Sequence, residues 1–238
     1  TLVYDPKEQE FRTKRGPIFA NVILADEINR SPAKVQSALL EAMQEHRVTV
    51  AGHTFELDQP FFVLATQNPI EQEGTYPLPE AQLDRFMLEL PIGYPTRAEE
   101  EEVAMRTTGS ETAQIHGVVT AAELIDLQHL VRRVPAPPSL VSFAVRLARA
   151  TRPGDEAAPV CRKYVSWGAG PRASQYLVLG AKARAAARGS AMPSLDDVRA
   201  VAPAVLAHRI VLNFEAEADG RRTRDVIQEL LKESNGWT

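Results

Sequence analysis

The chain has 238 residues, of which 44% are hydrophobic and 24% charged, and this composition excludes an intrinsically disordered protein. Its 27 basic and 31 acidic residues give a formal charge of −4, so no global field favours nucleic acid or an anionic membrane as a partner. No apolar run approaches the roughly 20 residues that cross a bilayer. The single cysteine, Cys161, excludes an internal disulfide, and we expect a reducing compartment, the cytoplasm.

The first hundred residues alternate between strand and helix patterns. Three apolar runs without polar alternation predict strands that are buried on both faces, at 21–25, 61–65 and 86–90. Two shorter stretches, at 2–12 and 48–57, have strand residues on both sides of a turn and predict hairpins. Strands that are interleaved with helices indicate an α/β core with a parallel sheet.

A helix is predicted after the first apolar strand. Ser31 precedes Pro32, so a capping hydroxyl would stand before a residue whose missing N–H costs nothing at the first helical position. Val35, Leu39 and Met43 then recur at intervals of four and predict the buried stripe of this helix.

From about residue 96 onward the strand patterns almost vanish. Thr120 and Glu123 have the spacing of a capping box and predict the start of a helix. Further helices are predicted at 139–150, 171–188, 194–207 and 222–233. Prolines and a glycine in 151–160 predict an exposed loop. We therefore expect two domains, an α/β core at 1–118 and an all-α domain at 119–238.

Two adjacent carboxylates, Asp26 and Glu27, follow the first apolar strand. Ligands bind at the carboxyl ends of strands in open α/β sheets. Phosphoryl transfer to water needs a metal ion and a group that positions the water, and Mg²⁺ keeps most of its own waters. Asp26 would hold Mg²⁺ through one of these waters while Glu27 polarises the nucleophile. Taken alone, the pair also fits the commoner use of such residues as helix caps.

Three further side chains are candidates for the same chemistry. Asn68 ends the second apolar strand, and if that strand lies beside the first, its amide can orient the attacking water. Arg85 and Arg172 are candidate donors to a γ-phosphate, because a guanidinium stays charged and can pair two oxygens. Each also has an ordinary alternative: a turn before proline for Asn68, and a surface ion pair for either arginine.

Four blocks of the chain, in order and in spacing, resemble the MoxR family of AAA+ ATPases: 24–30 (LADEINR), 36–43 (QSALLEAM), 65–69 (ATQNP) and 74–86 (GTYPLPEAQLDRF). The resemblance implies an AAA+ core of the P-loop NTPase type, followed by a helical lid. It also implies individual roles: Asp26 and Glu27 as Walker B, Asn68 as sensor 1, Arg85 as the arginine finger that reaches a neighbouring subunit, and Arg172 as sensor 2.

The same resemblance implies ATP and Mg²⁺ as ligands and a homo-oligomer, a hexamer, with chaperone-like action on a protein client. Proteins with von Willebrand factor A domains are frequent associates of the family. The 238 residues contain no Gly-Lys pair and therefore no phosphate-binding loop, so we expect that loop upstream of Thr1 and expect the chain to be a fragment. Two alternatives stay open: a non-hydrolysing scaffold, and a motor subunit of the magnesium-chelatase type.

Overall fold

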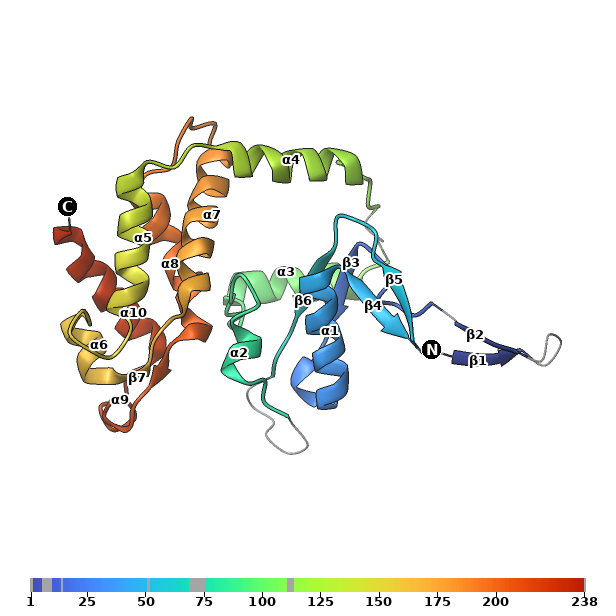
Figure 1. Cartoon of the computed structure of the whole chain (residues 1–238), viewed down its shortest axis with the longest axis horizontal. Helices are drawn as coiled ribbons and strands as arrows, with labels where there is room; N and C mark the ends of the chain where they lie inside the picture. The colour runs from blue at the N-terminus through green and yellow to red at the C-terminus, as the bar shows by residue number, and fades with distance from the viewer. Residues whose placement is uncertain are drawn as a thin grey trace.

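The computed structural model describes residues 2–5, 10–13, 15–50, 52–68, 76–110 and 114–237, with the first two ranges described as backbone only. Figure 1 shows strands β1 to β6 on one side of the molecule and a helical bundle, which also contains β7, on the other. Helix α4 (Ala121–Arg133) runs between the two ends. No helix in the described ranges is long and apolar enough to cross a membrane.

A two-stranded parallel sheet lies at the centre of the strand-bearing half. β3 (Val22–Ala25) pairs with β6 (Phe62–Ala65), so that Val22 lies opposite Phe62 and Ala25 opposite Ala65. The first two predicted strands are therefore confirmed, and the condition set for Asn68, that the two strands lie side by side, is met. Both predicted hairpins are also confirmed as antiparallel pairs: β1 (Leu2–Asp5) with β2 (Glu10–Thr13), and β4 (Arg47–Val50) with β5 (His53–Glu56).

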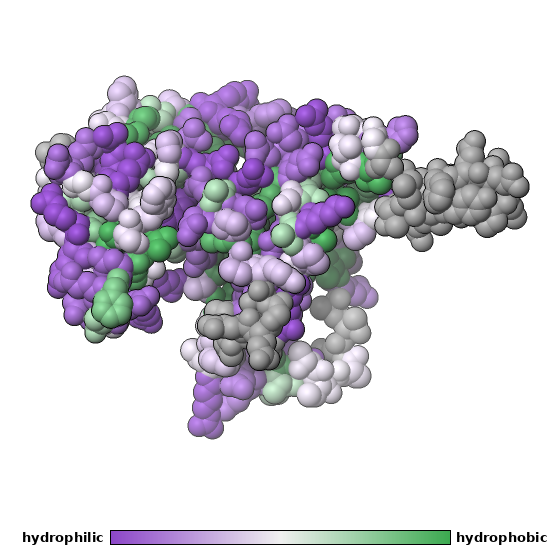
Figure 2. Space-filling model, turned by 60° about the horizontal axis from the view of Figure 1, so that its bottom comes forward, coloured by the Kyte–Doolittle hydropathy of each residue, from purple (hydrophilic) through white to green (hydrophobic). Residues whose placement is uncertain are grey.

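The prediction that these strands are buried on both faces is wrong. On one face, Ile23 and Val63 pack into a small core with Leu39 and Leu40 of helix α1. On the other face, four apolar side chains are 46–65% exposed: Val22, Leu24, Phe62 and Leu64. Figure 2 shows a surface that is mostly hydrophilic and interrupted by apolar patches. Both faces of the sheet carry apolar side chains, but among the described residues only one face has a layer packed on it.

The third predicted strand, at 86–90, is also wrong, because these residues join no sheet in the described structure. A strand is defined by its hydrogen-bonded neighbour, and this stretch bonds instead to the helical half. The amide of Glu89 donates to the carbonyl of Ala204 at 2.8 Å. Leu90 is 70% exposed, so the apolar run is not buried here.

Helix α1 (Ala33–Glu45) follows a 3₁₀ turn, η1 (Ile28–Arg30). Pro32 is its N-cap and no side chain caps it, so the predicted capping role of Ser31 is wrong. Leu39 is buried and Met43 packs against the same core as predicted, but Val35 is 52% exposed. Turning the helix in this way buries Gln36, a polar residue that the apolar pattern did not single out.

The helical half has one continuous core, and the four helices predicted there are confirmed to within two residues of their predicted ends. The capping box of Thr120 with Glu123 is also confirmed.

The remaining helices in the described residues are α2 (Glu80–Leu83), α3 (Arg97–Thr108), α5 (Pro138–Ala150), α6 (Pro159–Tyr164), α7 (Pro171–Ala187), α8 (Leu195–Leu206), η2 (Ala207–Arg209), α9 (Phe214–Ala218), α10 (Thr223–Glu233) and η3 (Ser234–Gly236).

Two features of this half differ from the prediction. The stretch 151–160 is not simply an exposed loop, because Thr151 is fully buried and its hydroxyl accepts a hydrogen bond from the amide of Ala169 at 2.9 Å. A small antiparallel pair also joins β7 (Val165–Trp167) to β8 (Val211–Leu212). Strands of three and two residues are too short to produce a periodic pattern in the sequence.

Candidate functional site

Asp26 and Glu27 lie at the carboxyl end of β3, directly beside the end of β6. The parallel ladder continues past both strands, because the amide of Thr66 donates to the carbonyl of Ala25 at 3.0 Å and the amide of Ile28 donates to the carbonyl of Thr66 at 3.0 Å. The two acids are thereby held at the sheet edge where α/β folds bind ligands.

The hydroxyl of Thr66 joins the two acids. It donates to Oδ1 of Asp26 at 2.5 Å and accepts from the backbone amide of Glu27 at 2.8 Å. Glu27 has a left-handed backbone, with φ of 47°, which is unfavourable for a residue with a Cβ by about 1–2 kcal/mol. Bonds from this hydroxyl and from the adjoining backbone stabilise that conformation, so the carboxylate directions depend on Thr66.

The Glu27 side chain forms an ion pair with Arg30, with Nε and Oε2 3.1 Å apart. Both side chains are about 40% exposed, and solvent weakens a pair of this kind to between zero and about 1 kcal/mol. The carboxylate of Glu27 is therefore held weakly and can exchange Arg30 for a water molecule or another ligand at little cost.

Asn68 lies beside Asp26 and Glu27, as predicted. Nδ2 of Asn29, in the turn after Glu27, donates to the carbonyl of Asn68 at 3.3 Å. The turn itself is held by Gln36, which is 2% exposed and whose Nε2 lies 3.0–3.1 Å from the carbonyls of Ile28, Ser31 and Tyr76. The structure therefore brings Asp26, Glu27 and Asn68 together on two neighbouring strand ends.

The donor set at this edge fits Mg²⁺. One exposed carboxylate, on Asp26, accepts a hydrogen bond from the hydroxyl of Thr66, and Glu27 supplies a second carboxylate at the next position. A protein site with one or two carboxylates and several retained waters is typical of Mg²⁺, which sheds its water reluctantly.

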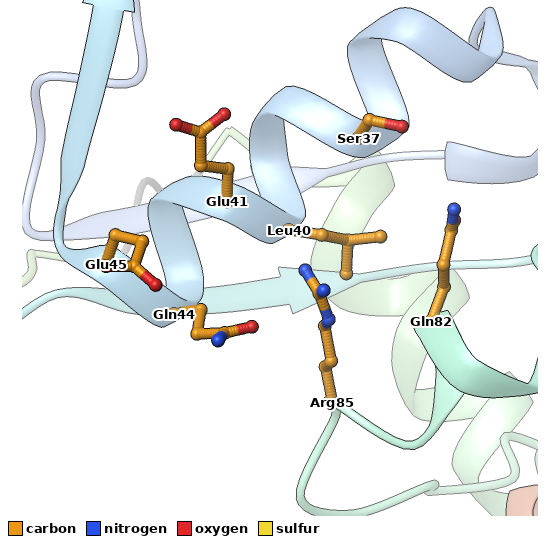
Figure 3. A pocket seen from close by; sticks show the side chains of 7 residues that line it. All are labelled: Ser37, Leu40, Glu41, Gln44, Glu45, Gln82 and Arg85. Atoms are coloured by element: carbon orange, nitrogen blue, oxygen red, sulfur yellow. The ribbon is translucent and has the colours of Figure 1, made fainter.

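Arg85 lies on the turn after α2. Its side chain points toward α1 and lines a surface cavity of about 320 Å³ (Figure 3). The other side chains that line the cavity are Ser37, Leu40, Glu41, Gln44, Glu45 and Gln82. The cavity is open to solvent, so the guanidinium of Arg85 stands on the molecular surface.

Arg172 lies in the first turn of α7 and pairs with Asp84 rather than with Asp26 or Glu27. Its Nη1 is 3.5 Å from Oδ2 of Asp84. The other oxygen of Asp84 accepts from Nε of Arg209 at 2.8 Å. The residue directly before Arg85 is thus the meeting point of two arginines from the helical half.

The sequence patterns missed several side chains that shape this site: Gln36, Thr66, Asp84, Tyr176 and Arg209. Gln36, Thr66 and Asp84 stand inside the quoted blocks, so their presence there was a usable signal. Gln36 and Arg209 act through burial and distant carbonyls, and no local pattern indicates either contact.

Comparison with known proteins agrees with this geometry. Residues 1–88 match the model of the ATPase family associated with various cellular activities (AAA), and residues 157–230 match that of the AAA lid domain. A crystal structure of a protein described as an ATPase, from Cytophaga hutchinsonii, superposes with a TM-score of 0.88 at 43% identity, covering 98% of this chain and 71% of that one. The fold is therefore an AAA+ ATPase core of the α/β class followed by a helical lid.

Relatives by sequence show which family of AAA+ ATPases the chain belongs to. The chain is 44% identical to Chaperone MoxR1 of Mycobacterium tuberculosis over 98% of its own length and spans 62% of that protein. It is 41% identical to the uncharacterized protein YeaC of Bacillus subtilis, of which it covers 69%, and 30% identical to Protein MoxR of Methylorubrum extorquens, of which it covers 68%. The chain belongs to the MoxR family of AAA+ ATPases.

Proposed function

We propose that these residues form the hydrolytic and lid parts of a Mg²⁺-dependent ATPase that remodels or activates a protein client. The observation that carries the proposal is the Thr66 hydroxyl, which holds Asp26 and the backbone of Glu27 at the ends of two adjoining strands. Two carboxylates with an amide side chain next to them are the groups that hydrolysis of a phosphoanhydride requires.

Each of these residues has a proposed role. Asp26 would hold Mg²⁺ through a water molecule, and the bound ion would neutralise charge on the phosphate oxygens. Glu27 leaves Arg30, turns to the attacking water and accepts its proton as the water oxygen bonds to the γ-phosphorus, while the bond from that phosphorus to the β–γ bridging oxygen breaks and ADP leaves. Asn68 orients that water through its side-chain amide.

The two arginines complete the proposed site. Arg85, on the surface, reaches the γ-phosphate of ATP bound by the next subunit, so that turnover requires a homo-oligomer, a hexamer in this family. Arg172 contacts the γ-phosphate from the lid, after leaving Asp84. Its pair with Asp84 is 3.5 Å long and about one-third exposed, so little free energy opposes the exchange. The proposed domain division falls at 118/119.

A protein client is the substrate class that the relatives support, because one of them is named a chaperone. The family resemblance adds a partner with a von Willebrand factor A domain. The cytoplasm is the proposed location. ATP binding also requires a phosphate-binding loop, so the test uses a polypeptide in which these residues are joined to one.

The test is ATP turnover by that polypeptide with Glu27→Gln. We expect turnover to fall about 100-fold or more, because a positioned base contributes this much to proton transfer. ATP binding, measured with a fluorescent ATP analogue, should stay within about twofold, since the amide keeps the shape of the side chain and removes only the base.

Glu101→Gln is the matched control, because Glu101 has an exposed ion pair with Arg97 on α3. It should leave turnover unchanged. Near-full turnover by the Glu27 variant would contradict the assigned role. An unmutated polypeptide that binds ATP and never hydrolyses it would favour the scaffold alternative over the ATPase.

A further inference from the structure

The turn that carries Arg85 is held by side chains of the helical half. Residues 84–90 join no sheet in the described structure, so secondary structure does not fix the direction of Arg85. Instead, each of four consecutive carbonyls, from residue 84 to residue 87, accepts a hydrogen bond from the lid. Tyr176 donates to Arg85, and Arg209 donates to Asp84, Phe86 and Met87.

Arg209 uses its complete set of donors in this contact. The guanidinium has five N–H groups. Nε donates to the Asp84 carboxylate at 2.8 Å, and Nη2 donates to the carbonyls of Asp84 and Phe86 at 2.8 and 2.6 Å. Nη1 donates to the carbonyls of Met87 and Val205 at 3.3 and 2.5 Å. Nη1 also lies 2.6 Å from Nε2 of His208, so four of the six partners of the guanidinium belong to the turn around Arg85.

Because the Arg209 side chain is buried, the loss of any of these hydrogen bonds is costly. The Arg209 side chain is 1% exposed, and its guanidinium also lies over the ring of Tyr176, 5.1 Å from the centroid. A buried carbonyl that loses its donor is destabilised by about 1–3 kcal/mol. The planar fork of arginine reaches acceptors on several sides, whereas the single ammonium of lysine has only three donors on one atom. No other residue type can satisfy this set.

We infer that Arg209 is a positioning residue for Arg85, through which the lid sets the direction of the group that reaches the neighbouring subunit. The inference rests on the proposed function, in which Arg85 acts on ATP bound next door. It follows that a change in lid position moves the Asp84–Met87 backbone directly, because Arg209 and Tyr176 move with the lid.

The first test is Arg209→Lys in the ATP-hydrolysing polypeptide. We expect kcat to fall about tenfold to 100-fold, since a displacement of a catalytic group by about 1 Å has effects of this size. The KM for ATP should change less than about twofold, because the binding residues of the same subunit are untouched. Arg188→Lys is the matched control, since Arg188 pairs with buried Asp197 inside the lid and does not reach the turn. It should leave kcat unchanged.

Mixing variant subunits separates an effect through Arg85 from an effect on the subunit's own site. Glu27→Gln subunits keep an intact Arg85, and Arg85→Ala subunits keep an intact Glu27. In a random equal mixture, about a quarter of the interfaces combine both intact groups, so turnover should exceed that of either variant alone. Absence of this recovery would contradict the proposed function itself.

If the recovery occurs, the behaviour of Arg209→Lys decides the inference. Acting through Arg85, it should recover turnover when mixed with Glu27→Gln and fail to do so with Arg85→Ala. The reverse pattern would place its defect in its own ATP site and overturn the inference. Equal recovery with both partners, or unchanged kcat for Arg209→Lys alone, would also overturn it.

Thermal unfolding shows whether Arg209→Lys folds. If it does not, Asp84→Asn replaces it in the same mixtures, because the amide keeps an oxygen facing Nε of Arg209 and removes the charge. The same two patterns then support or overturn the inference.

Discussion

The two halves of this molecule treat their apolar residues differently. The helical half buries them in one continuous core, in which Leu147, Leu177 and Leu206 are fully buried. The strand-bearing half has two small clusters and leaves one face of its sheet open, with Leu24 65% exposed. An apolar run therefore reports what a segment is able to bury, and the layer packed on it decides what is buried.

The largest expected effect tests this contrast directly. Leu147→Ala should lower the free energy of unfolding by about 3–4 kcal/mol, because it empties a fully buried site. Leu24→Ala should change it by less than about 0.5 kcal/mol, because most of that side chain already contacts water. Urea unfolding followed by circular dichroism measures both. Equal losses would show that the open face of the sheet is covered in solution.

A second prediction concerns the contact between the halves. Burial and the nearby charge of Arg209 lower the pKa of His208 to about 4 from its ordinary value of 6.5. As the pH falls, His208 is therefore protonated near pH 6.5 in the unfolded state, but only near pH 4 in the folded state. The stability contributed by the neutral imidazole is complete above pH 6.5 and is lost as the pH falls toward 4.

From about pH 7.5 to about pH 5, His208 should account for a loss of about 2 kcal/mol in the free energy of unfolding. His208→Gln should remove this part of the pH dependence, as measured by urea unfolding at both pH values. His116→Gln, at an exposed position, is the control and should keep the wild-type slope. An identical slope for the His208 variant would mean that the imidazole takes up its proton at the same pH in the folded and the unfolded protein.

The smallest effect compares two helix caps of the same type. Thr120 caps α4, which has no buried residue, and Ser194 caps α8, which lies in the core. Removing a capping hydroxyl costs about 1 kcal/mol. Thr120→Ala should speed amide exchange at 121–124 without moving the global unfolding midpoint, whereas Ser194→Ala should move the midpoint. A global shift from Thr120→Ala would show that α4 unfolds together with the bundle.

Much of the fold follows from local patterns. The lid helices were predicted because a period of 3.6 and the cap at Thr120 are written within one turn of the chain. The order of two apolar runs on either side of a helix permits the pairing of β3 with β6, and the structure shows that pairing. The strand at 86–90 was mispredicted for the opposite reason: pairing depends on a neighbour, and the amide of Glu89 found the helical half instead.

The sequence by itself determined which chemical groups are present and how they are spaced along the chain: Asp26 and Glu27 after one strand, Asn68 after the next, and an arginine at 85 and at 172. The proximity of Asp26, Glu27 and Asn68 at the sheet edge follows from the regular geometry of parallel strands. The tertiary structure decided in which directions the side chains of the site point. Thr66 fixes the directions of both acids, and Arg209, 125 residues from Asp84, holds the turn of Arg85. Hydrogen bonds between such distant segments form only when burial brings their donors and acceptors together.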